Sequence, residues 1–139
     1  MQRDPIMRNL DIVERHFALE ATDIDAAIDL YTDDVVWEWP SRRLALRGKS
    51  AVAENYRRIF AGLADLTVES HERFATADRV VDDSTVRFIR RGAANDSATP
   101  TGARVEMRLL HVFHVRDGRI ARELVFDAPP ADGDASPGG

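Results

Sequence analysis

A chain of 139 residues is long enough for one hydrophobic core and too short for two ordinary domains. Its acidic balance, with a formal net charge of -5, argues against a nucleic-acid partner, because such partners require clustered Lys and Arg. The absence of cysteine excludes disulfides, thiolate zinc sites and cysteine nucleophiles.

Three amphipathic helices are predicted in the first half of the chain. Apolar residues recur at helical spacing over residues 5–20, after a proline suited to a first turn. A capping box at residues 22–25 predicts a second helix, whose buried stripe includes Tyr31. A third helix is predicted from Val52 to Leu63, closed by Gly62.

The strands are predicted by β-rich runs and turn signals. A short strand is expected at residues 35–39, ended by Pro40, with an irregular stretch up to Gly48. Four more are expected at about residues 66–75, 79–91, 104–116 and 119–127. Asp117-Gly118 is a strong hairpin signal, so the last two strands should pair antiparallel.

The ends of the chain carry no folding signal. Residues 128–139 are rich in Pro, Gly and Asp and predict a disordered tail after a single domain of residues 1–127. The N-terminal residues lack the apolar segment of a secretory signal, and no run approaches the ~20 apolar residues of a membrane span. We therefore expect a cytoplasmic protein without a membrane partner.

The order of these elements and several short motifs resemble the nuclear transport factor 2-like superfamily, most closely its SnoaL-like polyketide cyclase and ketosteroid isomerase branch. The motifs are Asp23–Asp25, Leu30–Val35, Leu46–Lys49, Pro100–Gly102 and Val112–Ile120. The resemblance implies an α+β cup, in which three N-terminal helices pack on a curved antiparallel sheet around an apolar pocket. Such folds serve isomerases, cyclases, dehydratases, epoxide hydrolases and non-catalytic subunits.

The resemblance also places individual positions. The catalytic aspartate of ketosteroid isomerases falls on Trp39, which cannot abstract a proton, whereas their helical tyrosine falls near His16 and their proton-donating acid falls on His111. The acid/base aspartate of SnoaL-like cyclases falls on Asp127. The Asp, Arg, Asp set of the epoxide hydrolase branch is not found, because no inward carboxylate is identified on the strand around Arg87.

His111 is the strongest catalytic candidate. On strand 104–116 it shares a face with Val105, Met107, Leu109, Phe113 and Val115, and it is the polar member of that face. It is either a general acid/base or a core histidine satisfied by a hydrogen bond. His111 and His114 point to opposite faces, so they do not form a metal-chelating pair, and no metal site is expected.

Asp127 and His16 are the second catalytic candidates. Asp127 shares a face with Glu123 and is either a pocket acid or a solvated strand end, and Glu123 ranks below it. His16 lies on the flank of the first helix's apolar stripe and reaches either the pocket or the core edge.

Aromatic and apolar residues are candidates for the pocket wall. Trp37 and Trp39 alternate with Glu38 and lie on one face of a strand, where they either form a wall suited to a flat ligand or fill the core. Tyr56, Met107 and Phe113 are expected to line the same cavity, with core packing as the alternative for each.

These features favour an enzyme that needs no cofactor and moves a proton on a hydrophobic cyclic or polyketide-like carbonyl compound, as an isomerase or cyclase. A non-catalytic ligand-binding or accessory subunit and a dehydratase are the alternatives. Leu110 and Val112 lie among charges on the opposite sheet face, which predicts a homodimer.

Overall fold

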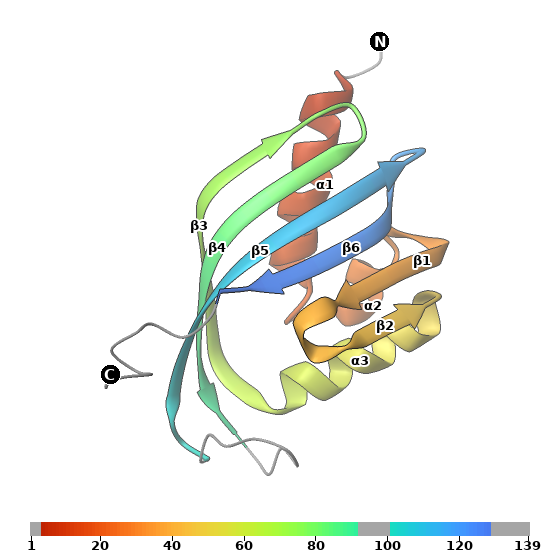
Figure 1. The fold of residues 1–139 in the computed structure, drawn as a ribbon. Helices are drawn as coiled ribbons and strands as arrows, with labels where there is room; N and C mark the ends of the chain where they lie inside the picture. The colour runs from red at the N-terminus through yellow and green to blue at the C-terminus, as the bar shows by residue number, and fades with distance from the viewer. Residues whose placement is uncertain (1–3, 92–100, 129–139) are drawn as a thin grey trace.

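The computed structural model describes residues 4–91 and 101–128, so nearly all of the predicted tail lies outside the described residues. The described residues form three α-helices, one short 3-10 helix and six strands of a single sheet, and all of the helices come before the third strand in the chain (Figure 1). The helices are α1 (Pro5–Leu19), α2 (Ile24–Ile28), η1 (Pro40–Arg42) and α3 (Lys49–Ala61). The strands are β1 (Tyr31–Trp39), β2 (Leu44–Arg47), β3 (Leu63–Ala75), β4 (Arg79–Arg90), β5 (Arg104–Arg116) and β6 (Arg119–Asp127).

The curved sheet has the strand order β2-β1-β6-β5-β4-β3, and the helices pack on one side of it (Figure 1). This confirms the α+β cup. The sheet is mixed rather than wholly antiparallel, because β1 and β6 pair in parallel. The long excursion through β2, α3 and β3–β5 separates these two strands, which allows a parallel pairing that no hairpin can make.

The helix ends follow the local sequence. Asp4 caps α1 by accepting a hydrogen bond from the Ile6 amide, and Pro5 occupies the first turn. Asp23 caps α2 in the same way through the Ala26 amide. Within the described residues no helix is long and apolar enough to cross a membrane.

Two local predictions were wrong. Tyr31 does not belong to α2 but begins β1, where it pairs with Ile120, and the Leu30 carbonyl accepts a hydrogen bond from the Ile120 amide. The predicted irregular stretch contains β2, which pairs antiparallel with β1 after Arg43 turns the chain at φ 54°. In both places, pairing with a distant or neighbouring strand outweighs weak local preference.

The hairpin between β5 and β6 forms at the predicted turn. Asp117 and Gly118 both have positive φ, at 53° and 77°, as a tight turn that follows the sheet twist requires. The resulting antiparallel register places His111 opposite Val125 and Phe113 opposite Glu123. The inward-pointing side chains of β5 and β6 therefore lie side by side on the face of the sheet that the helices cover.

Candidate functional site

A buried polar cluster lies between the helices and the sheet. Tyr31 from β1, Tyr56 from α3 and Glu123 from β6 meet there, and their exposed fractions are 0%, 3% and 2%. The Tyr31 hydroxyl donates to Glu123 Oε1 at 2.7 Å, and the Tyr56 hydroxyl donates to the same oxygen at 2.9 Å. The two tyrosine oxygens are 2.8 Å apart. Trp37 Nε1 donates to the Tyr56 hydroxyl at 3.1 Å.

The environment of Glu123 favours its protonated form. Burial raises the pKa of this carboxyl to about 7, although hydrogen bonds from Tyr31, Tyr56 and Trp37 act in the opposite direction. Burial, together with the nearby Glu123 charge, also raises the pKa of both tyrosines, which therefore stay protonated. The pKa of Glu123 thus lies near neutral pH, and two hydroxyl donors bind the carboxyl.

His16 belongs to the same cluster. Its Nε2 lies 3.3 Å from the Tyr31 hydroxyl and 3.5 Å from Glu123 Oε1. Burial lowers the pKa of His16 to about 3, and His111 and Arg73 lower it further. His16 is therefore a neutral imidazole near pH 7, and its contact with Glu123 is a polar contact rather than an ion pair.

His111 lies on the face predicted from strand alternation and packs against the helices. Its ring stacks on Phe113 at 5.9 Å and meets Phe17 of α1 edge-on at 5.1 Å. Burial lowers its pKa to about 4, with Asp82 opposing and Arg73 reinforcing the shift. His111 is a neutral, buried imidazole that lies opposite Asp82 in the β4–β5 register.

Asp127 lies apart from the Glu123 cluster, at the end of β6. Its Oδ1 accepts hydrogen bonds from Trp39 Nε1 at 3.0 Å and from the Ser41 hydroxyl. Although partial burial opposes ionisation, these bonds lower the pKa of Asp127. Arg42 covers the Trp39 ring at 4.1 Å. This carboxylate joins β6 to the turn after β1.

The predicted wall residues all pack in or against the core. Trp37, Trp39, Tyr56 and Phe113 are buried, and Met107 is half-buried against them. Trp37 meets Trp39 and Tyr56 edge-on. Tyr56 joins the wall to the polar cluster through its hydroxyl group.

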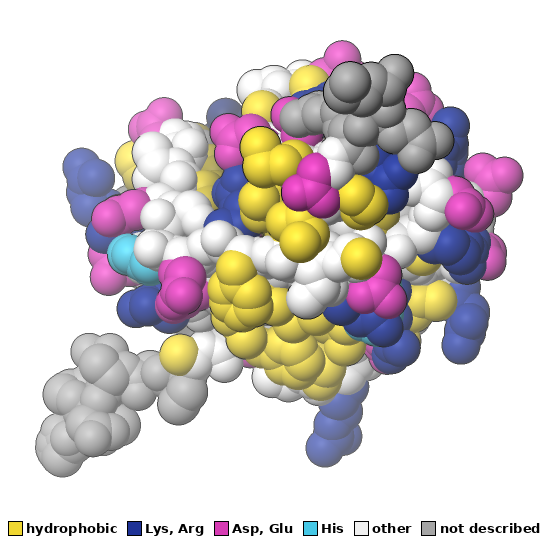
Figure 2. Space-filling model, turned by 90° about the horizontal axis from the view of Figure 1, so that it is seen from above, with side chains coloured by type: hydrophobic (Ala, Val, Ile, Leu, Met, Phe, Trp, Pro, Cys, Tyr) yellow, Lys and Arg dark blue, Asp and Glu magenta, His cyan; other side chains and the backbone are white. Residues whose placement is uncertain are grey.

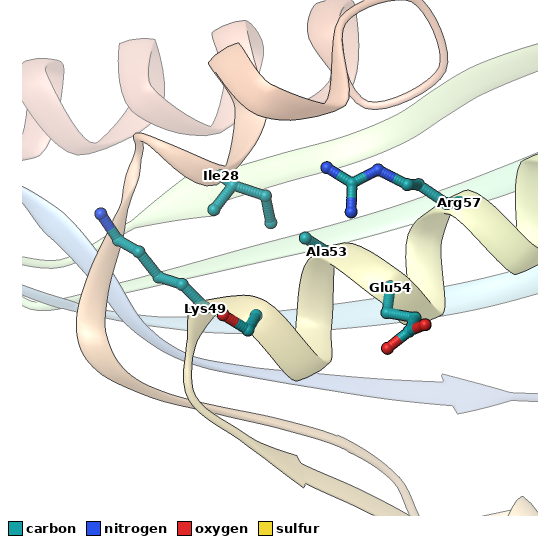
Figure 3. A pocket seen from close by; sticks show the side chains of 6 residues that line it. Ile28, Lys49, Ala53, Glu54 and Arg57 are labelled. Carbon is teal, nitrogen blue, oxygen red and sulfur yellow. The ribbon is translucent and has the colours of Figure 1, made fainter.

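Neither of the two best-formed hollows in the described part of the chain is lined by these wall residues. One of about 350 Å³ lies between α2 and α3 beside Lys49, Ala53 and Arg57 (Figure 3). The other, of about 470 Å³, lies between α1 and β3. Among the described residues, no group of three His, Asp or Glu side chains is placed to hold a metal ion.

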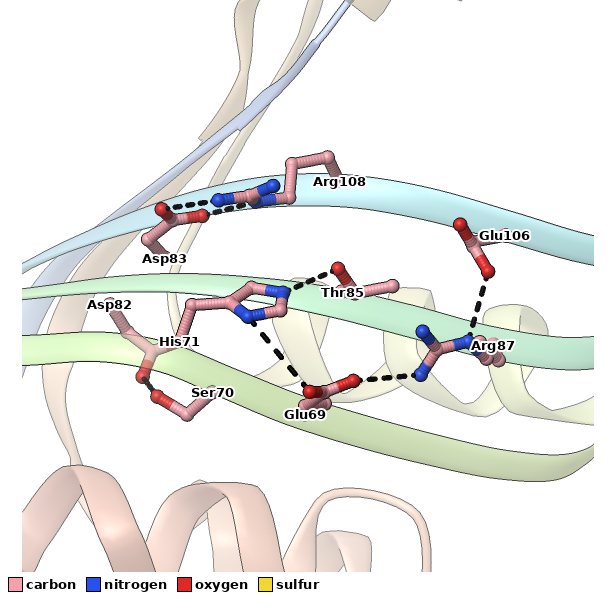
Figure 4. A network of polar contacts seen from close by, with 9 residues as sticks. All are labelled: Glu69, Ser70, His71, Asp82, Asp83, Thr85, Arg87, Glu106 and Arg108. Atoms are coloured by element: carbon pink, nitrogen blue, oxygen red, sulfur yellow. Dashed lines mark hydrogen bonds and ion pairs between the residues drawn. The ribbon is translucent and has the colours of Figure 1, made fainter.

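The sequence pattern did not reveal Asp82 as an inward residue, and it did not reveal that Glu123 lies in the buried cluster with Tyr31 and Tyr56. Asp82 is an inward carboxylate on β4, the strand of Arg87, which corrects the expectation that this strand carries none. Arg87 itself points outward and binds Glu69 and Glu106 (Figure 4). The spacing of Asp82 could have shown its inward position, because Asp82 lies two residues from both Val80 and Ser84 and so shares their face of the strand. All three side chains are fully buried.

The family comparison agrees with this architecture. The model of the SnoaL-like domain matches residues 13–123, which is most of the chain. The chain belongs to the SnoaL-like domain family. No curated protein matches it.

Solved structures share the fold across nearly the whole chain. An LEH-like epoxide hydrolase from M. tuberculosis is 25% identical, with a TM-score of 0.71 over 90% of this chain and 86% of that one. A protein of Jannaschia sp. CCS1 assigned to the SnoaL-like polyketide cyclases is 21% identical, with a TM-score of 0.79 over 94% and 99%. SalBIII, an epoxide hydrolase/cyclase-like enzyme of pyran ring formation in salinomycin, is 20% identical, with a TM-score of 0.71 over 88% and 91%.

Proposed function

We propose that this SnoaL-like protein is a cofactor-independent acid/base enzyme, an isomerase or cyclase that acts on a hydrophobic cyclic or polyketide-like carbonyl compound. The observation that carries the proposal is the Glu123 carboxyl, buried among two tyrosine hydroxyls and a neutral histidine. A general base works best when its pKa lies near the working pH, and burial brings the pKa of Glu123 to about 7.

In the proposed reaction, the ionised Glu123 removes a proton from the carbon next to the substrate carbonyl and leaves an enolate. In an isomerase, the protonated Glu123 returns that proton to a different carbon. In a cyclase, the enolate carbon instead attacks a second carbonyl, and the new alkoxide takes the proton. Tyr31 and Tyr56 hold the Glu123 carboxylate in place by donating to it.

His111 and His16 are proposed as the second polar groups. Both are neutral at pH 7, because burial lowers the pKa of each. A neutral imidazole donates a hydrogen bond to the substrate oxygen as its negative charge develops, and it takes up no full charge in the apolar surroundings. Asp127 is proposed to hold the Trp39 side chain in position rather than to transfer a proton.

The enclosure of the cluster favours a second function, a non-catalytic binding subunit. Glu123 is only 2% exposed, and its bonding oxygen is already shared by both tyrosines. For catalysis, a substrate must displace side chains to reach Glu123, whereas a binding protein needs only the apolar walls.

Deuterium exchange separates these functions. Cyclic ketones and enones, including α-tetralone, are incubated with the protein in deuterated buffer, and exchange next to the carbonyl is followed by NMR. We expect catalysed exchange that falls roughly 10²- to 10⁴-fold in Glu123→Gln. Glu106→Gln is the matched control, because Glu106 is an exposed partner of Arg87 on the outer face of β5. Ketone binding without exchange would contradict the enzyme and support the binding subunit.

We also propose a homodimer through the outer face of β5 and β6. Leu110 and Phe126 pair across these strands and are 38% and 39% exposed, beside the half-buried Val112 and Leu124. Hydrophobic side chains gather at the lower edge of Figure 2, the side that Figure 1 turns toward the viewer. Sedimentation should give a dimer at micromolar concentration and a monomer for Leu110→Glu. A stable monomer of the unmodified protein would reject the proposal.

A further inference from the structure

A second group of buried polar atoms lies on the inner face of β4 and β5. Asp82 Oδ1, Ser84 Oγ and His111 Nδ1 have no hydrogen-bond partner among the described residues. Their side chains are 0%, 0% and 6% exposed. A buried polar group without a hydrogen-bond partner is destabilising, so three neighbouring ones indicate a place for a polar molecule.

The sequence of β3 fixes the orientation of Asp82. Ser70 pairs with Ser84 and Glu72 with Asp83, so His71 is the extra residue of a β-bulge. The bulge turns both Ser70 and Arg73 inward, although they are three residues apart. Ser70 Oγ and Arg73 Nε donate to Asp82 Oδ2 at 2.6 and 2.7 Å. Both donors bind one oxygen, and the other, Oδ1, remains available as an acceptor.

The hollow between α1 and β3 lies next to this group, because two of its lining residues, Ser70 and Arg73, bind Asp82. Its apolar lining includes Phe17, Leu66 and Val68, and its polar lining includes Ser70 and Arg73, the two residues that hold Asp82. Figure 4 shows the Ser70–Asp82 hydrogen bond between the strands. A ligand in the hollow thus places an apolar body on β3 and a polar end beside Asp82.

The charges around the hollow disfavour an anion. Glu14 and Asp82 already bind Arg73, the cation of the lining. Glu20 and Glu123 lie close enough to interact electrostatically, and burial, followed by the charges of Glu123 and Asp82, raises the pKa of Glu20. The two nearby histidines, His16 and His111, are neutral near pH 7. A carboxylate on the ligand would therefore meet acids without a free positive partner.

We propose that this inner group is the binding site for the polar end of an uncharged ligand that carries a hydroxyl group beside its carbonyl-bearing apolar body. The hydroxyl donates to Asp82 Oδ1, and Ser84 Oγ donates to the oxygen of the same hydroxyl group. The inference rests on the proposed function, which supplies the carbonyl compound as the ligand. It adds that this ligand carries a hydroxyl group, has no net charge and enters past Arg73. It places this hydroxyl contact on Asp82, not on Glu123.

Binding of a matched ligand series tests the site. Tetralin, α-tetralone, its γ-hydroxy derivative and the corresponding keto acid share one bicyclic body and differ at the polar end. Affinities are measured by calorimetry with the full chain. We expect the hydroxy ketone to bind roughly tenfold or more tighter than α-tetralone, because hydrogen bonds to charged groups contribute about 1.5 to 3 kcal/mol. The keto acid should bind most weakly of the oxygenated compounds.

Asp82→Asn should remove the preference for the hydroxy ketone. Ser70 and Arg73 both donate to Asp82 Oδ2, so the oxygen of the new amide would take that position. The amide NH₂ would then replace Oδ1, and a hydrogen-bond donor would stand where the acceptor was. Asp83→Asn is the matched control, since Asp83 points outward and binds Arg108. Ser84→Ala supplies a second test if Asp82→Asn does not fold, and it should weaken the hydroxy ketone alone.

Three results would overturn the proposal. They are equal binding of the hydroxy ketone and α-tetralone, tightest binding of the keto acid, and an unchanged hydroxyl preference in every folded inner-face variant. Each leaves the proposed function intact as long as Glu123-dependent deuterium exchange is observed. Loss of that exchange with the hydroxyl preference retained would instead contradict the proposed function and leave the binding site standing.

Discussion

The two faces of β4 and β5 both carry polar residues but use them differently. On the outer face, Arg87 bridges Glu69 and Glu106, and Arg108 forms a two-bond pair with Asp83 (Figure 4). On the inner face, Asp82, Ser84 and His111 keep atoms without partners among the described residues. Exposed charges gain little from pairing, whereas buried polar atoms are costly to leave unpaired. The unpaired group therefore supports our proposal that the ligand binds at the inner face.

The pH dependence of stability should differ most between the two faces. The pKa of Glu123 is raised to about 7 in the folded protein from an ordinary value of 4.5. Its contribution to the free energy of unfolding is therefore complete below pH 4.5 and is lost as the pH rises to about 7. The two pKa values correspond to about 3 kcal/mol.

Urea unfolding at about pH 4.5 and pH 8 checks this contribution. Relative to Glu123→Gln, the unmodified protein should lose about 3 kcal/mol between these values. His16 and His111 act in the opposite direction, because their pKa values are lowered, but both proteins contain them and the effect cancels. Glu106→Gln should keep the dependence of the unmodified protein. A Glu123→Gln curve parallel to that of the unmodified protein would contradict the burial argument.

Matched arginine substitutions give the next largest contrast. Arg73→Leu leaves the fully buried Asp82 without its charged partner and should cost about 2 kcal/mol, less than for a wholly buried pair because Arg73 is 18% exposed. Arg108→Leu breaks an exposed pair and should change the free energy of unfolding little. Thermal unfolding of the two variants measures the difference. Equal destabilisation would remove the distinction between the faces.

Regular patterns made the fold and one side of the site predictable. Alternation along β5 correctly predicted that His111 lies on the helix-facing side, where it contacts Phe17. The Asp117-Gly118 pair correctly predicted the hairpin between β5 and β6. The partners of Glu123 were not predictable in this way. Tyr31 and Tyr56 lie 92 and 67 residues away from it in the chain, and Tyr31 was assigned to the wrong element.

Asp82 was missed for a different physical reason. Its donors come from β3, where the extra residue at His71 interrupts the alternation on which face assignments depend. Without that register, Ser70 and Arg73 are expected on opposite faces and no inward Arg–Asp pair can be assembled. Local periodicity therefore reveals which face a residue takes, but only the strand register reveals its partners.

Direct titration of the Glu123 carboxyl tests the central claim. Carbon NMR of protein labelled at glutamate side chains, assigned by comparison with Glu123→Gln, follows this carboxyl as the pH changes. The buried cluster with Tyr31, Tyr56 and His16 predicts a midpoint at about pH 7. A midpoint near the ordinary value of 4.5 would show that Glu123 is a permanently ionised carboxylate, and it would contradict its role as the proton-transferring group.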